Sequence, residues 1–286
     1  MNVAGVSEGT VPGTVTCGTC FHHCVLAEGG TGVCRARANQ GGKVVSLNYG
    51  RVTSLALDPI EKKPLKLFYP GSVILSAGSF GCNLACPFCQ NAAISQTGPD
   101  CPAEFIAPAE LAAKALLLAD RGNIGVAYTY NEPLVGWEFI RDTAAIVRAQ
   151  GMKNVVVTNG TAERGVLEEI LPYTDAMNID LKGFTPEWYR ALGGDLETVK
   201  RTIAVCVPRC HVELTTLVIP GRNDSESEME NLARWVASVD AEIPLHITRF
   251  FPRYRMTETD QTPADTVHRL VRTARRYLNR VFPGNL

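Results

Sequence analysis

The chain has 286 residues, of which 45% are hydrophobic and 20% charged, and its formal net charge is −1. This is the composition of a globular protein with a sizeable core. The near-zero charge gives no electrostatic reason to expect nucleic acid or an acidic membrane as a partner. No apolar run reaches the ~20 residues of a membrane-spanning helix. We therefore expect neither a membrane nor a nucleic-acid partner.

The first 16 residues are small and polar, without the basic stretch and apolar stretch that together make a signal peptide. We predict that residues 1–16 form a flexible N-terminus and that the protein is cytoplasmic. In that compartment, the ten cysteines of the chain are expected to bind metal rather than form disulfides.

Residues 17–70 are predicted to form a small N-terminal cysteine-rich lobe, because they are rich in glycine and hold little apolar core of their own. The cysteines of this lobe are Cys17, Cys20, Cys24 and Cys34. Four thiols at this spacing are enough for a closed zinc site or for a second iron–sulfur cluster. The spacing predicts a second metal and leaves its identity open, and a lobe without metal is the alternative.

Residues 71–286 alternate short β-branched runs with longer helical patterns. Strands are predicted at 72–77, 124–129, 154–158, 176–181, 211–219 and 244–250, and helices at 108–121, 134–150, 162–171, 196–206, 226–239 and 263–280. Ser225 and Thr262 are predicted helix N-caps. Six consecutive β-α units predict an α/β fold with a parallel sheet. Since a closed barrel has eight units, we expect a partial (β/α)6 TIM-like barrel, with a doubly wound sheet as the alternative.

Three cysteines, Cys82, Cys86 and Cys89, directly follow the first predicted strand of this barrel. In both architectures the functional site lies at the carboxyl ends of the strands. A [4Fe–4S] cluster normally takes four cysteines, so the spacing C-x3-C-x2-C leaves one iron open. Zinc sites usually supply their fourth ligand nearby, whereas the next cysteine here is Cys101. The spacing therefore favours an incomplete iron–sulfur cluster.

The run Gly81-Cys-Asn-Leu-Ala-Cys-Pro-Phe-Cys-Gln-Asn91 resembles the cluster loop of radical S-adenosylmethionine (SAM) enzymes, in which an aromatic residue, here Phe88, precedes the last cysteine. The likeness extends from Cys17 to about Pro252. It is greatest to activating-enzyme-like proteins related to pyruvate formate-lyase activase, in particular the radical SAM member of the AmmeMemoRadiSam system. The motifs that carry this narrower resemblance include Asp58-Pro-Ile-Glu-Lys-Lys-Pro64, Tyr128-Thr-Tyr-Asn-Glu-Pro133, Asn178-Ile-Asp-Leu-Lys182 and Pro244-Leu-His-Ile-Thr-Arg-Phe-Phe-Pro252.

The resemblance implies an oxidoreductase that uses a [4Fe–4S] cluster to cleave SAM reductively to methionine and a 5′-deoxyadenosyl radical. That radical would abstract a hydrogen atom from an unidentified substrate. By analogy with the activases the substrate is a backbone glycine of another protein, and the narrower resemblance suggests a Memo-like or AMMECR-type partner. A one-electron donor of flavodoxin or ferredoxin type would reduce the cluster. The alternative function is a non-catalytic scaffold whose cysteines bind zinc.

Polar residues follow the next predicted strands at the same rim. Asn131 and Glu132 stand where the family has the Gly-Gly-Glu motif that binds the amino group of SAM, and an N-cap role is the alternative for Glu132. Asp180 and Lys182 are two residues apart and so face the same side of a strand. The resemblance implies that Thr158, Asp180 and Lys182 lie near the methionine carboxylate or ribose of SAM. A structural Asp–Lys pair is the alternative.

Two further residues are predicted to contact the cofactors. Phe88 is included because of its place in the cluster loop. His246 lies among apolar residues of the sixth predicted strand, and it is either a hydrogen-bonded core residue or a rim residue that positions SAM or substrate. No role is assigned to Cys101, Cys206 or Cys210.

Overall fold

The computed structural model describes residues 13–286, and its centre is an eight-stranded sheet with the order β14-β13-β12-β11-β10-β9-β7-β6. Adjacent strands from β7 to β14 run parallel, and β6 lies antiparallel to β7 at one edge. The bounds are β6 Ser54–Pro59, β7 Val73–Gly78, β9 Asn123–Tyr128, β10 Lys153–Thr158, β11 Ala176–Asp180, β12 His211–Val218, β13 Leu245–Arg249 and β14 Val281–Gly284.

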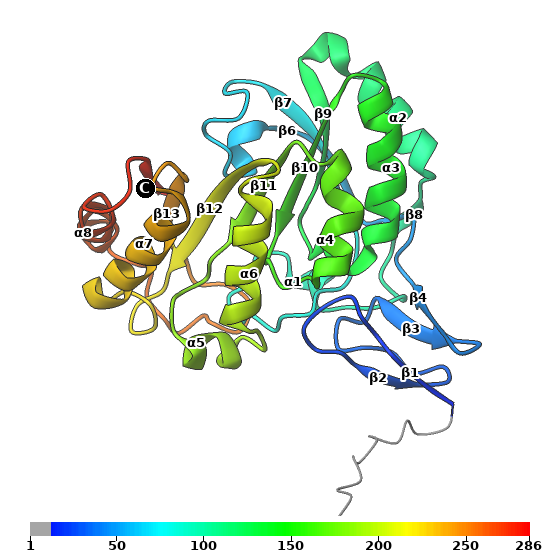
Figure 1. Ribbon diagram of the computed structural model, residues 1–286, viewed down its shortest axis with the longest axis horizontal. Coiled ribbons are helices and arrows are strands. Elements are labelled where there is room, and N and C mark those ends of the chain that lie inside the picture. The colour runs from blue at the N-terminus through cyan, green and yellow to red at the C-terminus, as the bar shows by residue number, and fades with distance from the viewer. Residues whose placement is uncertain (1–12) are drawn as a thin grey trace, which may run out of the picture.

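Helices connect the successive parallel strands and cover the outer face of the sheet (Figure 1). They are α2 Pro108–Leu117, α3 Trp137–Ala149, α4 Arg164–Ile170, α6 Leu196–Cys206, α7 Glu226–Asp240 and α8 Ala264–Ala274. Each new parallel strand is added on the same side of the previous one, so the order never reverses as it does in a doubly wound sheet. The predicted α/β fold with a partial TIM-like barrel is confirmed, and the doubly wound alternative is excluded.

The two faces of the sheet bury different parts of the chain. Outward side chains such as Val126, Val156 and Leu214 form the main core with the covering helices. The inner face packs against residues 60–68, which we call the plug segment, through Ile60, Leu65 and Phe68. This segment includes the 3-10 turn η1 Ile60–Lys62. The plug segment thus fills the lumen of the partial barrel behind the rim where the cysteine loop lies.

The edges of the sheet and one helix differ from the prediction. Strands β6 and β14 were not predicted, because neither has a clear alternating pattern and each depends on a neighbouring strand. Ser225 caps α7 as expected, accepting a hydrogen bond from the Glu228 N–H at 3.2 Å. Thr262 does not cap α8: its hydroxyl donates to the Val218 carbonyl at 2.6 Å, and Pro263 occupies the N-cap position.

The N-terminal lobe consists of two hairpins, formed by β1 Thr14–Thr16 with β2 Val25–Ala27 and by β3 Arg37–Gln40 with β4 Lys43–Ser46. Most of the segment predicted to be flexible, residues 1–16, lies outside the described residues, but its end forms β1. Strand β6 joins the central sheet, so the sheet begins before residue 71, within the segment predicted as the lobe. In Figure 1 the lobe, α1 and α5 lie along the same lower edge.

The remaining elements are short. They are β5 Arg51–Val52, β8 Glu104–Phe105, α1 Ala92–Ser95, α5 Pro186–Ala191 and the 3-10 turns η2 Ala119–Arg121, η3 Pro133–Gly136 and η4 Leu171–Tyr173. Across residues 13–286, no helix combines the length and the apolar character needed to span a bilayer.

Candidate functional site

The three-cysteine loop leaves the carboxyl end of β7 and runs into α1, and several separate parts of the chain hold its backbone. The Gly81 N–H donates to the Ile94 carbonyl at 3.0 Å, and the Ala85 N–H donates to the Leu192 carbonyl at 2.9 Å. The Pro87 carbonyl accepts from the Arg255 N–H at 2.9 Å. The loop is therefore fixed by main-chain bonds to α1, to the end of α5 and to the segment after β13.

An apolar shell surrounds the thiols of this loop. Cys86 and Phe88 are buried in a cluster with Trp188, Leu192, Ile219 and Phe250. The rings of Phe88 and Trp188 stack with their centroids 6.1 Å apart. Burial raises the pKa of the Cys86 thiol to about 11, so a nearby positive charge such as a bound metal is needed to favour the thiolate.

Glu132 is a buried carboxylate, 3% exposed, between the adjacent strand β9 and η3. Its Oε1 accepts from the Thr158 hydroxyl at 2.7 Å and from the Leu134 N–H at 3.1 Å, and its Oε2 accepts from the Asn159 N–H at 2.7 Å. The bond from Leu134 makes Glu132 the N-cap of η3, as its alternative interpretation predicted. Burial raises the pKa of Glu132 to about 7, although the three hydrogen bonds act in the opposite direction.

Two asparagines connect Glu132 to the cysteine loop. Besides its backbone bond to Glu132, Asn159 donates from Nδ2 to Asn83 Oδ1 at 2.9 Å and approaches Cys82 Sγ at 3.8 Å. Asn83 in turn donates to the Thr161 hydroxyl at 2.7 Å. Neither asparagine was predicted from the sequence as a site residue. Their positions, one inside the cysteine loop and one directly after β10, were the available signal.

The Asn131 side chain hydrogen-bonds to the backbone at the start of the three-cysteine loop. Its Nδ2 donates to the carbonyls of Phe80 at 3.2 Å and Gly81 at 2.9 Å, while its Oδ1 accepts from the Ser79 N–H at 3.1 Å. Both polar atoms of the Asn131 amide therefore hydrogen-bond to backbone at the start of the loop. In this arrangement Asn131 positions the residues that precede Cys82.

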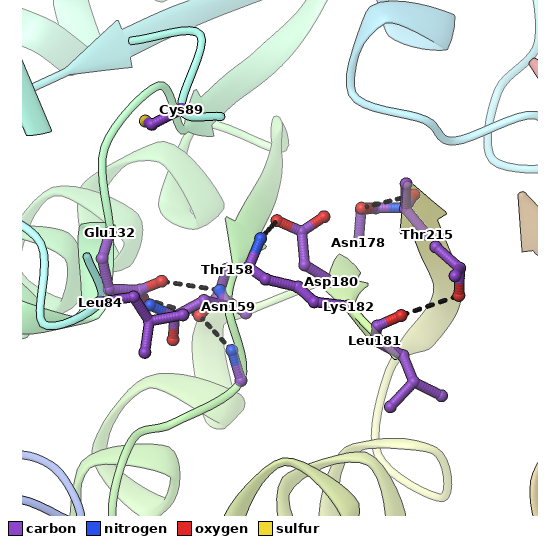
Figure 2. A network of polar contacts seen from close by, with 12 residues as sticks. Leu84, Cys89, Glu132, Thr158, Asn159, Asn178, Asp180, Leu181, Lys182 and Thr215 are labelled. Carbon is purple, nitrogen blue, oxygen red and sulfur yellow. Dashed lines mark hydrogen bonds and ion pairs between the residues drawn. The ribbon is translucent and has the colours of Figure 1, made fainter. Parts of the chain in front are cut away.

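Asp180 and Lys182 form an ion pair at the carboxyl end of β11, with Lys182 Nζ 2.7 Å from Asp180 Oδ2. In the view of Figure 2, this pair lies between Glu132 and the hydrogen-bonded Asn178 and Thr215. Burial acts to lower the pKa of Lys182, but the charge and hydrogen bond of Asp180, together with the nearby Cys86 and Tyr189, outweigh burial and the pKa is raised. Burial raises the pKa of the Cys82 and Cys86 thiols, and the nearby Lys182 ammonium partly opposes that rise, so Lys182 lies near the cysteine loop.

The family model of the radical SAM superfamily matches residues 78–236, which is more than half of the chain. The chain belongs to the radical SAM superfamily. An uncharacterized protein of Methanocaldococcus jannaschii is 40% identical over 257 residues, covering 88% of this chain and 75% of that protein.

A second relative carries a functional name. The pyruvate formate-lyase-activating enzyme of Clostridium pasteurianum is 27% identical over 169 residues, covering 56% of this chain and 67% of that enzyme. The fold is similar to that of a radical SAM methyltransferase from Sphaerobacter thermophilus, with a TM-score of 0.57 and 16% identity over 76% of this chain and 67% of that one. The protein is thus a radical SAM, activating-enzyme-like enzyme, which argues against the non-catalytic zinc scaffold.

Membership of this family implies a [4Fe–4S] cluster and SAM, and the residues at the rim fit both groups. Three thiols on one loop are the donor set for three irons of a cluster, and the apolar shell limits access of water to them. The neighbouring Glu132, Asp180 and Lys182 offer charges of both signs, as a zwitterionic methionine group requires. The family also implies reductive cleavage of SAM.

His246 is placed in the lumen of the radical SAM barrel as a buried hydrogen-bonded residue. Its Nε2 lies 2.6 Å from Glu213 Oε2, and Glu213 also binds His211 and the N–H groups of Lys66 and Leu67. This is the core arrangement that the sequence allowed as an alternative. Glu213 was missed, although a carboxylate inside an apolar strand signals a buried partner. A contact of His246 with SAM stays a prediction.

The four N-terminal cysteines gather in the lobe that packs against the three-cysteine loop. The Cys17 N–H donates to the Cys24 carbonyl at 2.9 Å, and Cys17, Cys20 and Cys34 are buried. Within residues 13–286, no three His, Cys, Asp or Glu side chains are grouped around a point where one ion would bind. The His22 ring lies 2.9 Å from the Asn83 carbonyl, so the lobe contacts the three-cysteine loop directly.

Proposed function

We propose that Cys82, Cys86 and Cys89 hold the [4Fe–4S] cluster and that SAM binds beside them at the carboxyl ends of β9, β10 and β11. The observation that supports this most is the position of three thiols on one fixed loop next to a buried carboxylate and an ion pair. When bound, the reduced cluster and SAM supply the 5′-deoxyadenosyl radical that abstracts hydrogen. The protein binds, orients and shields these groups.

In this proposal each charged residue at the rim binds the group of SAM that carries the opposite charge. Glu132 faces the ammonium group of its methionine part, and that contact would lower the raised pKa of the carboxyl. Lys182 faces the carboxylate, with Asp180 and Thr158 near the ribose or the ammonium. Asn131 and Phe88 act by positioning the loop.

The substrate we propose is a protein, with hydrogen abstraction from a backbone glycine as the reaction. Support comes from the relative that is named as an activating enzyme. The narrower sequence resemblance suggests instead that a Memo-like or AMMECR-type protein is the partner. A flavodoxin or ferredoxin would supply the electron, and the oxidoreductase class follows from that chemistry.

A second metal bound by Cys17, Cys20, Cys24 and Cys34 completes the proposal. Burial raises the pKa of Cys20 to about 11, so these thiols too need a cation to become ligands. Zinc and a second iron–sulfur cluster remain the two candidates. Metal analysis of protein purified without reconstitution distinguishes them, since zinc gives no iron–sulfur absorption.

The first experiment is anaerobic reconstitution with iron and sulfide, followed by dithionite reduction with SAM. We expect cluster absorption and release of 5′-deoxyadenosine. The Cys86→Ala variant should lose that release, whereas Cys206→Ala, which removes a fully buried thiol inside α6, should keep it. Retained cleavage in Cys86→Ala would refute the ligand assignment.

A separate experiment addresses the substrate. The reconstituted enzyme is incubated with SAM, reductant and a candidate protein encoded by a neighbouring gene, and the mixture is frozen for electron paramagnetic resonance. A glycyl radical in that protein supports an activase. Consumption of SAM that depends on a Memo-like protein, without a glycyl radical, supports the other partner.

A further inference from the structure

A surface groove borders the cysteine loop at Pro87. It has a volume of about 340 Å³, and its lining comes from the loop itself, from α5 and from the segments after β12 and β13. The residues that matter for its chemistry are Pro87, Trp188, Arg222, Arg255, Met256 and Glu258. The groove therefore opens to solvent and is lined in part by the loop that carries the predicted cluster ligands.

The groove is basic although the whole chain is nearly neutral. Arg222 and Arg255 are exposed, and neither has a carboxylate partner among residues 13–286. Their guanidinium groups lie over aromatic rings instead, that of Arg222 5.9 Å from the Trp188 ring and that of Arg255 5.1 Å from the Tyr254 ring. Glu258 is the acidic residue in the lining. Two arginines against one carboxylate give the groove lining a net positive charge, which suits an acidic partner.

The floor of the groove is also close to the predicted cluster ligands. Pro87 lies between Cys86 and Cys89 in the chain, and its carbonyl accepts the Arg255 N–H at 2.9 Å. Phe88 stacks on Trp188, which reaches the groove lining. Because the rate of electron tunnelling falls exponentially with distance, a redox partner must dock where few atoms separate it from the cluster. The groove provides such a place.

We propose that this groove is the docking site for a small acidic one-electron carrier protein, and the proposal rests on the cluster assignment above. One electron would pass from the reduced flavin or iron–sulfur centre of the carrier to the oxidised cluster. The carrier would be oxidised and the cluster reduced by that one electron, and no atom would be transferred. The arginines steer the carrier into place, while Met256 and Trp188 provide apolar contact. Redox complexes of this kind have small, weak interfaces.

The test uses the reconstituted full-length protein and a flavodoxin as the probe. Arg222→Glu/Arg255→Glu reverses both charges, and Arg222→Gln/Arg255→Gln only removes them. The matched control is Arg209→Glu/Arg272→Glu, which makes the same charge change at exposed arginines located before β12 and on α8. Binding of oxidised flavodoxin is measured by biolayer interferometry. Electron transfer is followed as formation of flavodoxin semiquinone from the hydroquinone.

We expect charge reversal to weaken flavodoxin binding by roughly tenfold or more, charge removal to weaken it less, and the control to leave it unchanged. Added salt should weaken wild-type binding much more than that of the reversed variant. Dithionite, which needs no docking site, should drive SAM cleavage equally in all four proteins. If dithionite fails with the wild type, the proposed function fails, and the binding measurements still decide the docking site.

Three results would overturn the docking site. The first is equal flavodoxin binding by the reversed variant and the control. The second is absence of measurable binding of flavodoxin, and of a ferredoxin used in its place, to the wild type. The third is loss of dithionite-driven cleavage in the reversed variant at full iron content, because the groove would then act on SAM or the substrate.

Discussion

Replacing Gly81 by alanine should disrupt the packing of the N-terminal lobe against the three-cysteine loop. Gly81 has a φ of +90°, and a Cβ atom there would lie 2.6 Å from the Cys34 carbonyl oxygen and 2.9 Å from the Ala36 Cβ. The left-handed backbone costs an alanine about 1–2 kcal/mol. The clash with fixed backbone adds roughly 1–3 kcal/mol. Gly81→Ala should therefore lose about 2–5 kcal/mol of unfolding free energy, and the strain falls one residue before Cys82.

Gly151→Ala is the control, since Gly151 has a φ of +75° and no heavy atom within 4 Å of its Cβ position. It carries the backbone cost of about 1–2 kcal/mol without the clash. Urea unfolding measures both variants, and iron and sulfide content after reconstitution reports on the cluster loop. We expect Gly81→Ala to be the less stable variant and to bind less iron. Equal stability and equal iron content would refute the packing of the lobe against the loop.

Three other changes test the buried carboxylates. Burial would raise the pKa of Glu213, but its histidine and backbone donors lower it to about 2 from 4.5; its stabilisation is complete above pH 4.5 and is lost towards pH 2. Wild-type stability should fall over that interval by up to ~3 kcal/mol more than that of Glu213→Gln, and parallel urea curves would contradict this. The pKa of Glu132 is raised from 4.5 to about 7, so its contribution to stability is present below pH 4.5 and is lost as pH rises through 7. Glu132→Gln should flatten this dependence and weaken SAM binding in equilibrium dialysis; an unchanged pH profile would exclude a buried, titrating Glu132. Thr158→Val removes a donor to Glu132 and should destabilise the protein by about 1–2 kcal/mol, and a loss below a few tenths in urea unfolding would argue against that hydrogen bond.

Local sequence patterns were sufficient to predict most of the strands and helices. The six predicted strands and their helices appear, because alternation and helical periodicity report on burial within one segment. Most ends are shifted by a few residues, but the last helix ends at Ala274 and not at residue 280. Strands β6 and β14 escaped prediction because their pairing depends on β7 and β13. The plug segment likewise carries no local signal of its place in the lumen, where Glu213 and Asn178 bind its backbone.

The candidate site divides in the same way. The spacing of Cys82, Cys86 and Cys89 and their position after a strand predicted the cluster chemistry, because one short loop carries all three thiols. The partners of Glu132 and His246 come from other strands, so only the tertiary structure decided that Thr158 and Asn159 bind one and Glu213 the other.

The groove at Pro87 depends wholly on the tertiary structure. The segment after β13 folds back onto the cluster loop, and no pattern within either segment encodes that contact. By itself, the sequence therefore determined the chemistry that one loop can carry and the repeated β-α architecture. Hydrogen bonds and packing between distant segments decided which charges are buried, which are paired and which stay open to a partner.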